Sequence, residues 1–390
     1  MDSTINTLNQ ESIKSKQNTI NHIFSHNHNW DIYEYNHKDN LRDVEIKEVR
    51  KMLGCQDDSR GYFVYMCPNC GDSKIIHFGC NSRICTHCGK KYTDSWAKKL
   101  AGRTFDVAHR HVVLTIPAQL RQIFQESRCL LKVLMDSCIA AISTLMKYQL
   151  RRDVMPGIIA VIHTYGKDLK FNPHVHALVT EGGFTSEGKW IDIKSYWYRT
   201  LRRTWQYHLL TNLKKGMKNN KNNGLINYLF KRYSNGFYVR SKDRIERKYE
   251  LIKYIGRYIR HPAIAESRIE KYDGKSVTFW YVDNNKVKHW INMFVEKFIG
   301  AIIGHIPEIQ FKTIRYYGVY CRPKRQYFKE LLSEFIGLVS ITQEKLLRWC
   351  GRWAPECDRC GCKMDLVWFG KGPPSKEVQF GEKIVHWAYM

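Results

Sequence analysis

Alternating apolar and polar positions in the middle of the chain predict a set of β-strands. The stretch HRHVVLTIP, which begins at His109, is typical of a buried strand that ends at Pro117. After Pro156, GIIAVIHTYG and HVHALVTEGG are two further β-rich runs with a short polar connection between them. The short connection favours an antiparallel pair. Further along, KSVTFWYVD and TIRYYGVY also have the composition of strands.

Helical spacing of apolar residues is found between these strands. AQLRQIFQESRCLLKVLMDSCIAAISTLMKYQLRR carries it from residue 118 to residue 152, and DRIERKYELIKYIGRYIRHP carries it up to Pro262. The stretch LKKGMKNNKNNG, which begins at Leu213, is typical of a polar loop. Strands and helices in this mixed order predict an α+β fold with a central antiparallel sheet flanked by helices.

The chain has 390 residues, of which 43% are hydrophobic, so it is long enough for two or three folded units. We expect a polar, loosely ordered arm over residues 1–44, with room for one docked helix. A cysteine-containing module follows over 45–98, then a main domain over 99–345 and a C-terminal tail with further cysteines over 346–390.

The charge is strongly positive, with 63 Lys and Arg against 37 Asp and Glu and a net charge of +26. Such an excess favours nucleic acid as the partner, although a role in solubility alone stays open. No apolar run approaches the ~20 residues of a membrane span, and the start MDSTINTLNQESIKSK lacks the apolar core of a signal peptide. We therefore expect no membrane partner and a cytoplasmic protein, associated with the nucleoid when it binds DNA.

Two CxxC motifs, Cys67-Pro-Asn-Cys70 and Cys85-Thr-His-Cys88, predict a zinc site in the 45–98 module. Each motif offers a pair of thiolates, and two pairs complete a tetrahedral shell around one ion. Four further candidate ligands lie close by in the sequence: Cys55, Cys80, His77 and His87. They either form part of a second site or replace one of the four, and reduced cysteines without metal are the alternative to both.

A second cysteine cluster lies near the C-terminus, in CDRCGCKM. It offers Cys357, Cys360 and Cys362, with Cys350 upstream. This cluster is a weaker candidate for a second zinc site because its fourth ligand is not evident from the spacing.

Two histidines, His174 and His176, stand either side of Val175 in one of the predicted strands. Alternate residues of a strand point to the same face, so both imidazoles lie on one side of the sheet. His163 lies in the preceding strand and can complete a cluster of three if the two strands pair. Three ligands with open positions are typical of a catalytic metal ion. Packing of the histidines in a core is the alternative.

Tyr254 and Tyr258 are four residues apart in LIKYIGRYIRHP. On a helix this spacing places both phenols on one face, where Lys253 and Arg257 would contact DNA. Two such phenols could attack phosphorus, whereas most tyrosine pairs at this spacing only pack helices. The neighbouring Gly256 favours a functional role, because glycine costs a helix about 1 kcal/mol relative to alanine.

Taken together, these motifs resemble the two-tyrosine HUH transposases of rolling-circle insertion sequences. The resemblance covers residues 50 to 365 and rests on the zinc module followed by HVVLTIP, IHTYG, PHVHALV, YIGRYI, EKFIGAIIGHIP and IRYYG in that order. It implies an HUH endonuclease fold, with His174 and His176 as the HUH pair and His163 as the histidine of the preceding strand. Asn172 departs from the pattern, because many relatives have a further histidine there.

The resemblance also implies an activity. Tyr254 and Tyr258 would be the nucleophiles that cleave single-stranded DNA at the element ends and target, leaving the 5′ phosphate on tyrosine. Mg²⁺ or Mn²⁺ would be the catalytic cofactor, and zinc would be structural. A replication initiator or relaxase with the same chemistry, and a zinc-ribbon DNA-binding protein without enzymatic activity, are the two alternatives.

Overall fold

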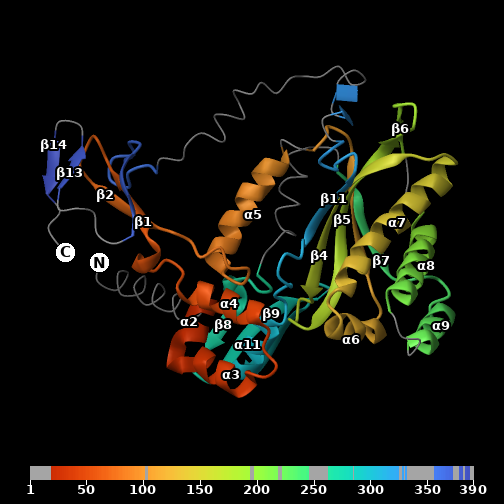
Figure 1. Ribbon diagram of the computed structural model, residues 1–390, viewed down its shortest axis with the longest axis horizontal. Coiled ribbons are helices and arrows are strands. Elements are labelled where there is room, and N and C mark those ends of the chain that lie inside the picture. The colour runs from red at the N-terminus through yellow and green to blue at the C-terminus, as the bar shows by residue number, and fades with distance from the viewer. Residues whose placement is uncertain are drawn as a thin grey trace.

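The computed structural model describes residues 19–101, 104–193, 197–217, 222–245, 262–283 and 285–324, with shorter stretches at 327–328, 330–331, 355–371, 377–380 and 383–386. Figure 1 shows an α+β architecture built around a central antiparallel sheet, as the sequence predicts. No helix in this part of the chain is long and apolar enough to cross a membrane.

The central sheet has the strand order β11-β4-β5-β3-β7, and β6 pairs with β5. Its strands are β3 (His109–Thr115), β4 (Met155–Tyr165), β5 (Phe171–Phe184), β6 (Trp190–Asp192), β7 (Val239–Ile245) and β11 (Ile314–Gly318). Every neighbouring pair is antiparallel. The two central strands, β4 and β5, form a hairpin, which confirms the antiparallel pair predicted from the sequence.

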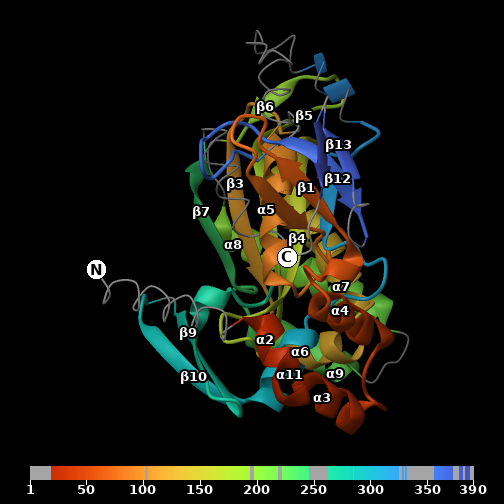
Figure 2. The ribbon, with the colours of Figure 1, turned by 90° about the vertical axis from the view of Figure 1, so that its left-hand side faces the viewer.

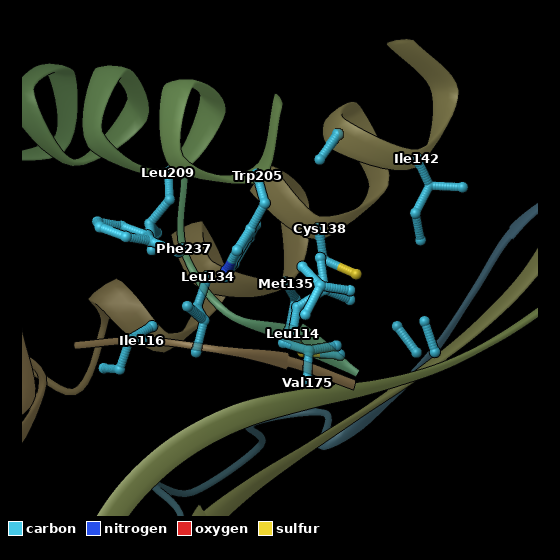
Figure 3. Packing of buried hydrophobic residues seen from close by; sticks show 14 of the residues in the cluster. Leu114, Ile116, Leu134, Met135, Cys138, Ile142, Val175, Trp205, Leu209 and Phe237 are labelled. Carbon is cyan, nitrogen blue, oxygen red and sulfur yellow. The ribbon is translucent and has the colours of Figure 1, made fainter. Parts of the chain in front are cut away.

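Four helices cover one face of this sheet: α6 (Ala118–Glu126), α7 (Leu130–Leu150), α8 (Tyr198–Gly216) and α9 (Asn223–Arg232). In Figure 3, Leu114 and Val175 on the sheet lie below Met135 and Trp205 on the helices. All four side chains are fully buried, and each such burial contributes about 1.5–3 kcal/mol to stability. The core therefore uses the alternate strand positions that point away from the histidines.

The helical pattern from residue 118 to residue 152 belongs to two helices rather than one. The chain turns between α6 and α7, where the side chain of Arg128 donates hydrogen bonds to the carbonyl oxygens of Gly304 (2.6 Å) and Ile306 (3.3 Å). The second predicted helix is expected to begin at Asp243. This start is wrong, because residues 243–245 are the last residues of strand β7. Residues 246–261 lie outside the described residues.

A second unit combines segments from both ends of the sequence. Helices α2 (Ile20–Ser25), α3 (Asn29–His37), α4 (Asp43–Leu53) and α11 (Val295–Ile303) pack with a sheet of β8 (Ile269–Tyr272), β9 (Ser276–Val282) and β10 (Lys288–Phe294) (Figure 2). Phe24 and Trp30 are buried in this core beside Phe279 and Phe298. The expectation of a loosely ordered arm is therefore wrong for residues 19–44, because Ile20, Ile23, Phe24 and Trp30 are core residues.

The cysteine-containing module is a three-stranded sheet followed by a helix. β1 (Tyr62–Met66) pairs with β2 (Ser73–His77) on one side and with β12 (Asp365–Gly370) on the other, and α5 (Thr86–Ala101) follows. Another hairpin joins β13 (Glu377–Phe380) to β14 (Lys383–His386). The C-terminal segment is thus not a separate tail, because residues 365–370 complete the sheet of the N-terminal module.

Candidate catalytic metal centre and cysteine clusters

Three histidines gather on the face of the central sheet opposite α7 and α8. His163 on β4 lies directly across from His174 on β5, and His176 is two positions further along β5. One ring nitrogen of each histidine lies within 4.8 Å of those of the other two. Only 8% of His176 is exposed. The structure therefore brings together the three residues that the sequence predicts as metal ligands.

Hydrogen bonds orient two of these rings. Nδ1 of His174 lies 2.7 Å from the carbonyl oxygen of Asn172. A carbonyl oxygen only accepts, so Nδ1 carries the proton and Nε2 keeps a lone pair for a metal. Nδ1 of His176 bonds Nε2 of His111 on β3 at 3.0 Å. Nε2 of His176 keeps a lone pair for a metal in the tautomer in which Nδ1 of His176 is the donor of this bond.

Burial keeps the histidine centre in a form that can bind metal. Removal from water lowers the pKa of His174, and nearby Arg121 lowers it further. Burial lowers the pKa of His176 well below its usual value, with the neighbouring His163, His174 and His111 adding to the effect. Neutral imidazole is the form that ligates metals, so these two rings are ready to bind a cation at neutral pH.

His111 and Arg121 were missed by the sequence reasoning. His111 stands two residues after His109 in HRHVV, so the two side chains share one face of the predicted strand. The pairing of β3 with β5 puts that face on the same side of the sheet as the predicted ligands. Arg121 lies on α6, and its Nε is buried with no hydrogen-bond partner within the described residues. Only the packing of α6 beside β5 brings this cation near His174.

The predicted nucleophiles, Tyr254 and Tyr258, lie outside the described residues, as do Lys253 and Arg257. Tyr165, by contrast, stacks on His163 with 5.2 Å between ring centroids. Burial raises the pKa of Tyr165, which makes its phenol harder to ionise and a poor nucleophile in this environment.

The cysteines form two clusters that differ from the predicted one. The first contains Cys55, Cys80, Cys85 and Cys88, and the second contains Cys67, Cys70, Cys357 and Cys360. In the first, the sulfur atoms of Cys55 and Cys85 are 3.5 Å apart, and those of Cys80 and Cys88 are 3.6 Å apart. In the second, the sulfurs of Cys67 and Cys360 are 3.4 Å apart, and those of Cys70 and Cys357 are 3.5 Å apart.

The prediction that the two CxxC motifs share one ion is therefore wrong. Cys67 and Cys70 lie at the turn of the β1–β2 hairpin, whereas Cys85 and Cys88 lie beyond its open end. A five-residue strand such as β1 separates its two ends by roughly 15 Å. Each motif is therefore joined by two cysteines from elsewhere in the chain.

Neighbouring residues shape the two clusters further. A Cβ atom at Gly79 would lie 2.8 Å from Sγ of Cys88, so a side chain at this position would displace the sulfur. Cys362 is not part of the second cluster; its carbonyl oxygen accepts a hydrogen bond from the backbone N–H of Cys357. His77 bonds Asp58 instead of joining the first cluster. Four thiols at these distances are the donor set that zinc prefers.

Comparisons with known proteins match both halves of this architecture. A family model described as "Putative transposase" (Y2_Tnp) matches residues 157–327. A second, described as "Transposase zinc-binding domain" (Zn_Tnp_IS91), matches residues 26–116. The first spans the histidine centre, and the second spans the first cysteine cluster together with Cys67 and Cys70.

Curated proteins are similar over most of the chain. The "Transposase for insertion sequence element IS801" of Pseudomonas savastanoi pv. phaseolicola is 30% identical over 294 residues, which cover 71% of this chain and 70% of that protein. The "Putative transposase y4qJ" of Sinorhizobium fredii is 25% identical over 338 residues, which cover 78% of this chain and 84% of that protein. No solved structure matches the chain. The chain therefore belongs to the IS91-type family of insertion-sequence transposases and carries the family's zinc-binding domain.

Proposed function

We propose that this transposase cleaves and rejoins single-stranded DNA through a 5′-phosphotyrosine intermediate, in rolling-circle transposition of an insertion sequence. The observation that carries the proposal is the three-histidine centre on neighbouring antiparallel strands. It is the arrangement expected of an HUH endonuclease, and it lies within the region similar to transposases.

The donor set at this centre fits a divalent cation. His163, His174 and His176 offer three ring nitrogens. The bond from Nδ1 of His174 to a carbonyl oxygen leaves Nε2 of that ring to bind metal, and Nε2 of His176 would do so with Nδ1 donating to His111. Mg²⁺ or Mn²⁺ bound there would supply positive charge beside the scissile phosphate. Imidazole ligands suit Mn²⁺ better than Mg²⁺, so we expect tighter binding of Mn²⁺.

Tyr254 and Tyr258 would act as the nucleophiles. The phenol oxygen of one tyrosine attacks the phosphorus and loses its proton, while the bond from phosphorus to the 3′ oxygen breaks and that oxygen leaves as a hydroxyl. A DNA 3′ hydroxyl later attacks the phosphotyrosine and releases the phenol. One phosphate ester replaces another in each step, so rejoining needs no external energy source. The second tyrosine allows a second cleavage while the first strand end is still held.

Cationic side chains would hold the DNA. The net charge of +26 supplies affinity for the phosphate backbone. We assign Lys253 and Arg257 to the DNA strand next to the tyrosines. Single-stranded DNA at the element ends and at the target would be the partner, and the protein would act in the cytoplasm on the nucleoid.

The first cysteine cluster, formed by Cys55, Cys80, Cys85 and Cys88, would hold a structural zinc ion. Its thiols come from the end of α4, the segment after β2 and the start of α5. The ion would therefore connect three segments of the chain at the edge of the core that contains Phe24, Trp30 and Phe298. We propose that this module, over residues 45–98, binds DNA and that residues 99–345 carry the nuclease.

The proposal is tested by covalent trapping. End-labelled single strands from the two ends of the element are incubated with the protein and Mn²⁺, and the products are separated under denaturing conditions. We expect a labelled protein–DNA adduct and a free 3′ hydroxyl on the released fragment. Cleavage without any adduct would contradict a tyrosine nucleophile, and the absence of both would contradict the nuclease assignment.

A further inference from the structure

The turn at Cys67 and the turn at Cys357, although far apart in the sequence, have the same local structure. The N–H of Gly71 donates to the carbonyl oxygen of Cys67 at 3.0 Å, and the N–H of Gly361 donates to that of Cys357 at 2.9 Å. Both glycines have a φ of +73°, a conformation that glycine adopts without strain. These two CxxCG turns, which we call knuckles, are therefore equivalent, whereas Gly89 after Cys88 makes the same hydrogen bond without a positive φ.

The two knuckles face each other. Sulfur atoms approach across them at 3.4 Å (Cys67 to Cys360) and 3.5 Å (Cys70 to Cys357), and all four lie within 4.8 Å of one another. These distances are too long for a disulfide, in which the two sulfur atoms are about 2.05 Å apart. Four sulfurs at about 2.3 Å from a tetrahedral zinc ion are about 3.8 Å apart, which is close to the arrangement found here.

We propose that Cys67, Cys70, Cys357 and Cys360 bind a second structural zinc ion, which fastens the C-terminal segment to the N-terminal module. Two of these four ligands lie outside residues 26–116, where the zinc-binding family model matches. The apolar core at this end of the module is small: among the described residues, its buried members are Cys67, Cys357 and Met364. So small a core needs a metal ion to stay closed.

The metal would also keep β12 paired with β1. The two strands are in register from Met66 opposite Asp365 to Tyr62 opposite Gly370, with a shift between Val64 and Tyr65. The knuckle at Cys357 lies just before β12, so its zinc ion would anchor the strand at that end. One zinc ribbon would therefore be built from two segments that are far apart in the sequence, residues 62–77 and residues 357–370.

The other end of β12 lies beside an open cavity. Lys371 follows this strand and lines an open cavity of about 520 Å³ together with Arg60 and Lys91. The rings of Phe63 and Phe78 line the same cavity. Three cations beside aromatic rings are suited to the phosphates and bases of a DNA strand. We infer that the second zinc completes a DNA-contacting surface by holding Lys371 in place, an inference that rests on single-stranded DNA as the partner.

The zinc site is tested by its stoichiometry in the full-length protein. We expect two zinc ions per chain by elemental analysis, and one in the double variant Cys357→Ser/Cys360→Ser. Cys362→Ser is the matched control, because Cys362 directly follows the knuckle and is not one of the four clustered cysteines; this variant should keep both ions. Equal zinc content in the double variant and the wild type would overturn the site, as would loss of an ion from the Cys362 control.

Proteolysis gives a second readout that does not depend on activity. Loss of the second zinc should expose the segment from residue 355 to residue 371 to limited digestion while the central sheet stays protected. Digestion of that segment at the wild-type rate in a variant that has lost one zinc would contradict the fastening role.

The DNA surface is tested separately by Lys371→Gln. Binding to a labelled oligothymidylate should weaken several-fold, and its dependence on salt should become shallower by roughly the contribution of one phosphate contact. Lys363→Gln is the control, since Lys363 lies in the same segment but does not line the cavity. Unchanged binding by Lys371→Gln, with two zinc ions present, would overturn the DNA contact and leave the zinc site standing.

Discussion

His111 and His176 lie side by side on neighbouring strands, with Nε2 of His111 3.0 Å from Nδ1 of His176 and the two rings nearly parallel at 5.1 Å between centroids. This contact fixes the orientation of His176 toward the other two histidines. We therefore predict that His111→Phe weakens Mn²⁺ binding by roughly 10–100-fold, the usual effect of losing such a supporting bond. Titration followed by the electron paramagnetic resonance of Mn²⁺ measures it.

A matched variant separates orientation from packing in that experiment. His111→Gln keeps a hydrogen-bonding group near Nδ1 of His176 and should recover part of the affinity, whereas His111→Phe should not. Equal loss in both variants, with unchanged circular dichroism, would contradict an orienting hydrogen bond.

The proposed metal ligands should be required for cleavage but not for DNA binding. We expect His174→Ala or His176→Ala to abolish adduct formation while affinity for single-stranded DNA changes less than about twofold, because phosphate contacts come from Lys and Arg. His289→Ala, on the separate β9–β10 pair, should leave both unchanged. DNA affinity that collapses together with cleavage, in a folded variant, would instead indicate a structural role.

The double variant Tyr254→Phe/Tyr258→Phe should fold and bind DNA without forming any adduct. Tyr to Phe removes one oxygen and little volume, so only a nucleophilic role makes the change severe. Each single variant should cleave once and fail at complete strand exchange, as measured with two-strand substrates. Tyr148→Phe, at an exposed position, is the control. An adduct in the double variant would place the nucleophile elsewhere, and loss of all activity in only one single variant would indicate a one-tyrosine enzyme.

The pH dependence of stability should report on His305. Burial lowers the pKa of this side chain to about 4 from 6.5. Between these values the unfolded chain binds more protons than the folded one, so the free energy of unfolding decreases as pH falls from about 6.5 to 4. The decrease from this group is about 3 kcal/mol at most.

Urea unfolding at pH 7 and pH 4.5 checks this prediction. His305→Gln should be less stable at pH 7, because it loses the bond from Nε2 to the carbonyl oxygen of Leu169. Its stability should nevertheless depend less on pH than that of the wild type. Identical pH dependence in the two proteins would show that His305 is not the titrating group.

The first cysteine cluster should be essential for the fold of its module. We expect Cys80→Ser to lose one zinc ion and the protection of residues 55–98, while the core around Trp205 keeps its hydrogen-exchange protection. Cys138→Ala is a suitable contrast, since Cys138 is buried in that core and belongs to neither cluster; it should keep both ions at a cost of about 1 kcal/mol. Full zinc content in Cys80→Ser would contradict the ligand assignment.

The sequence determined those features that depend on local order. Alternation along a strand placed His174 and His176 on one face, and the short connection from His163 made an antiparallel pair the simplest arrangement. The spacing of apolar residues and the CxxC motifs indicated an α+β fold with zinc, because periodicity and ligand pairs are properties of neighbouring residues.

Only the tertiary structure decided which distant residues meet. The β1–β2 hairpin carries Cys67 and Cys70 away from Cys85 and Cys88, and the return of β12 brings Cys357 to the first pair. Likewise, His111 reaches His176 only because β3 pairs with β5. Contacts between segments far apart in the sequence depend on strand order and register, which local patterns of side chains do not specify because several pairings bury the same apolar residues.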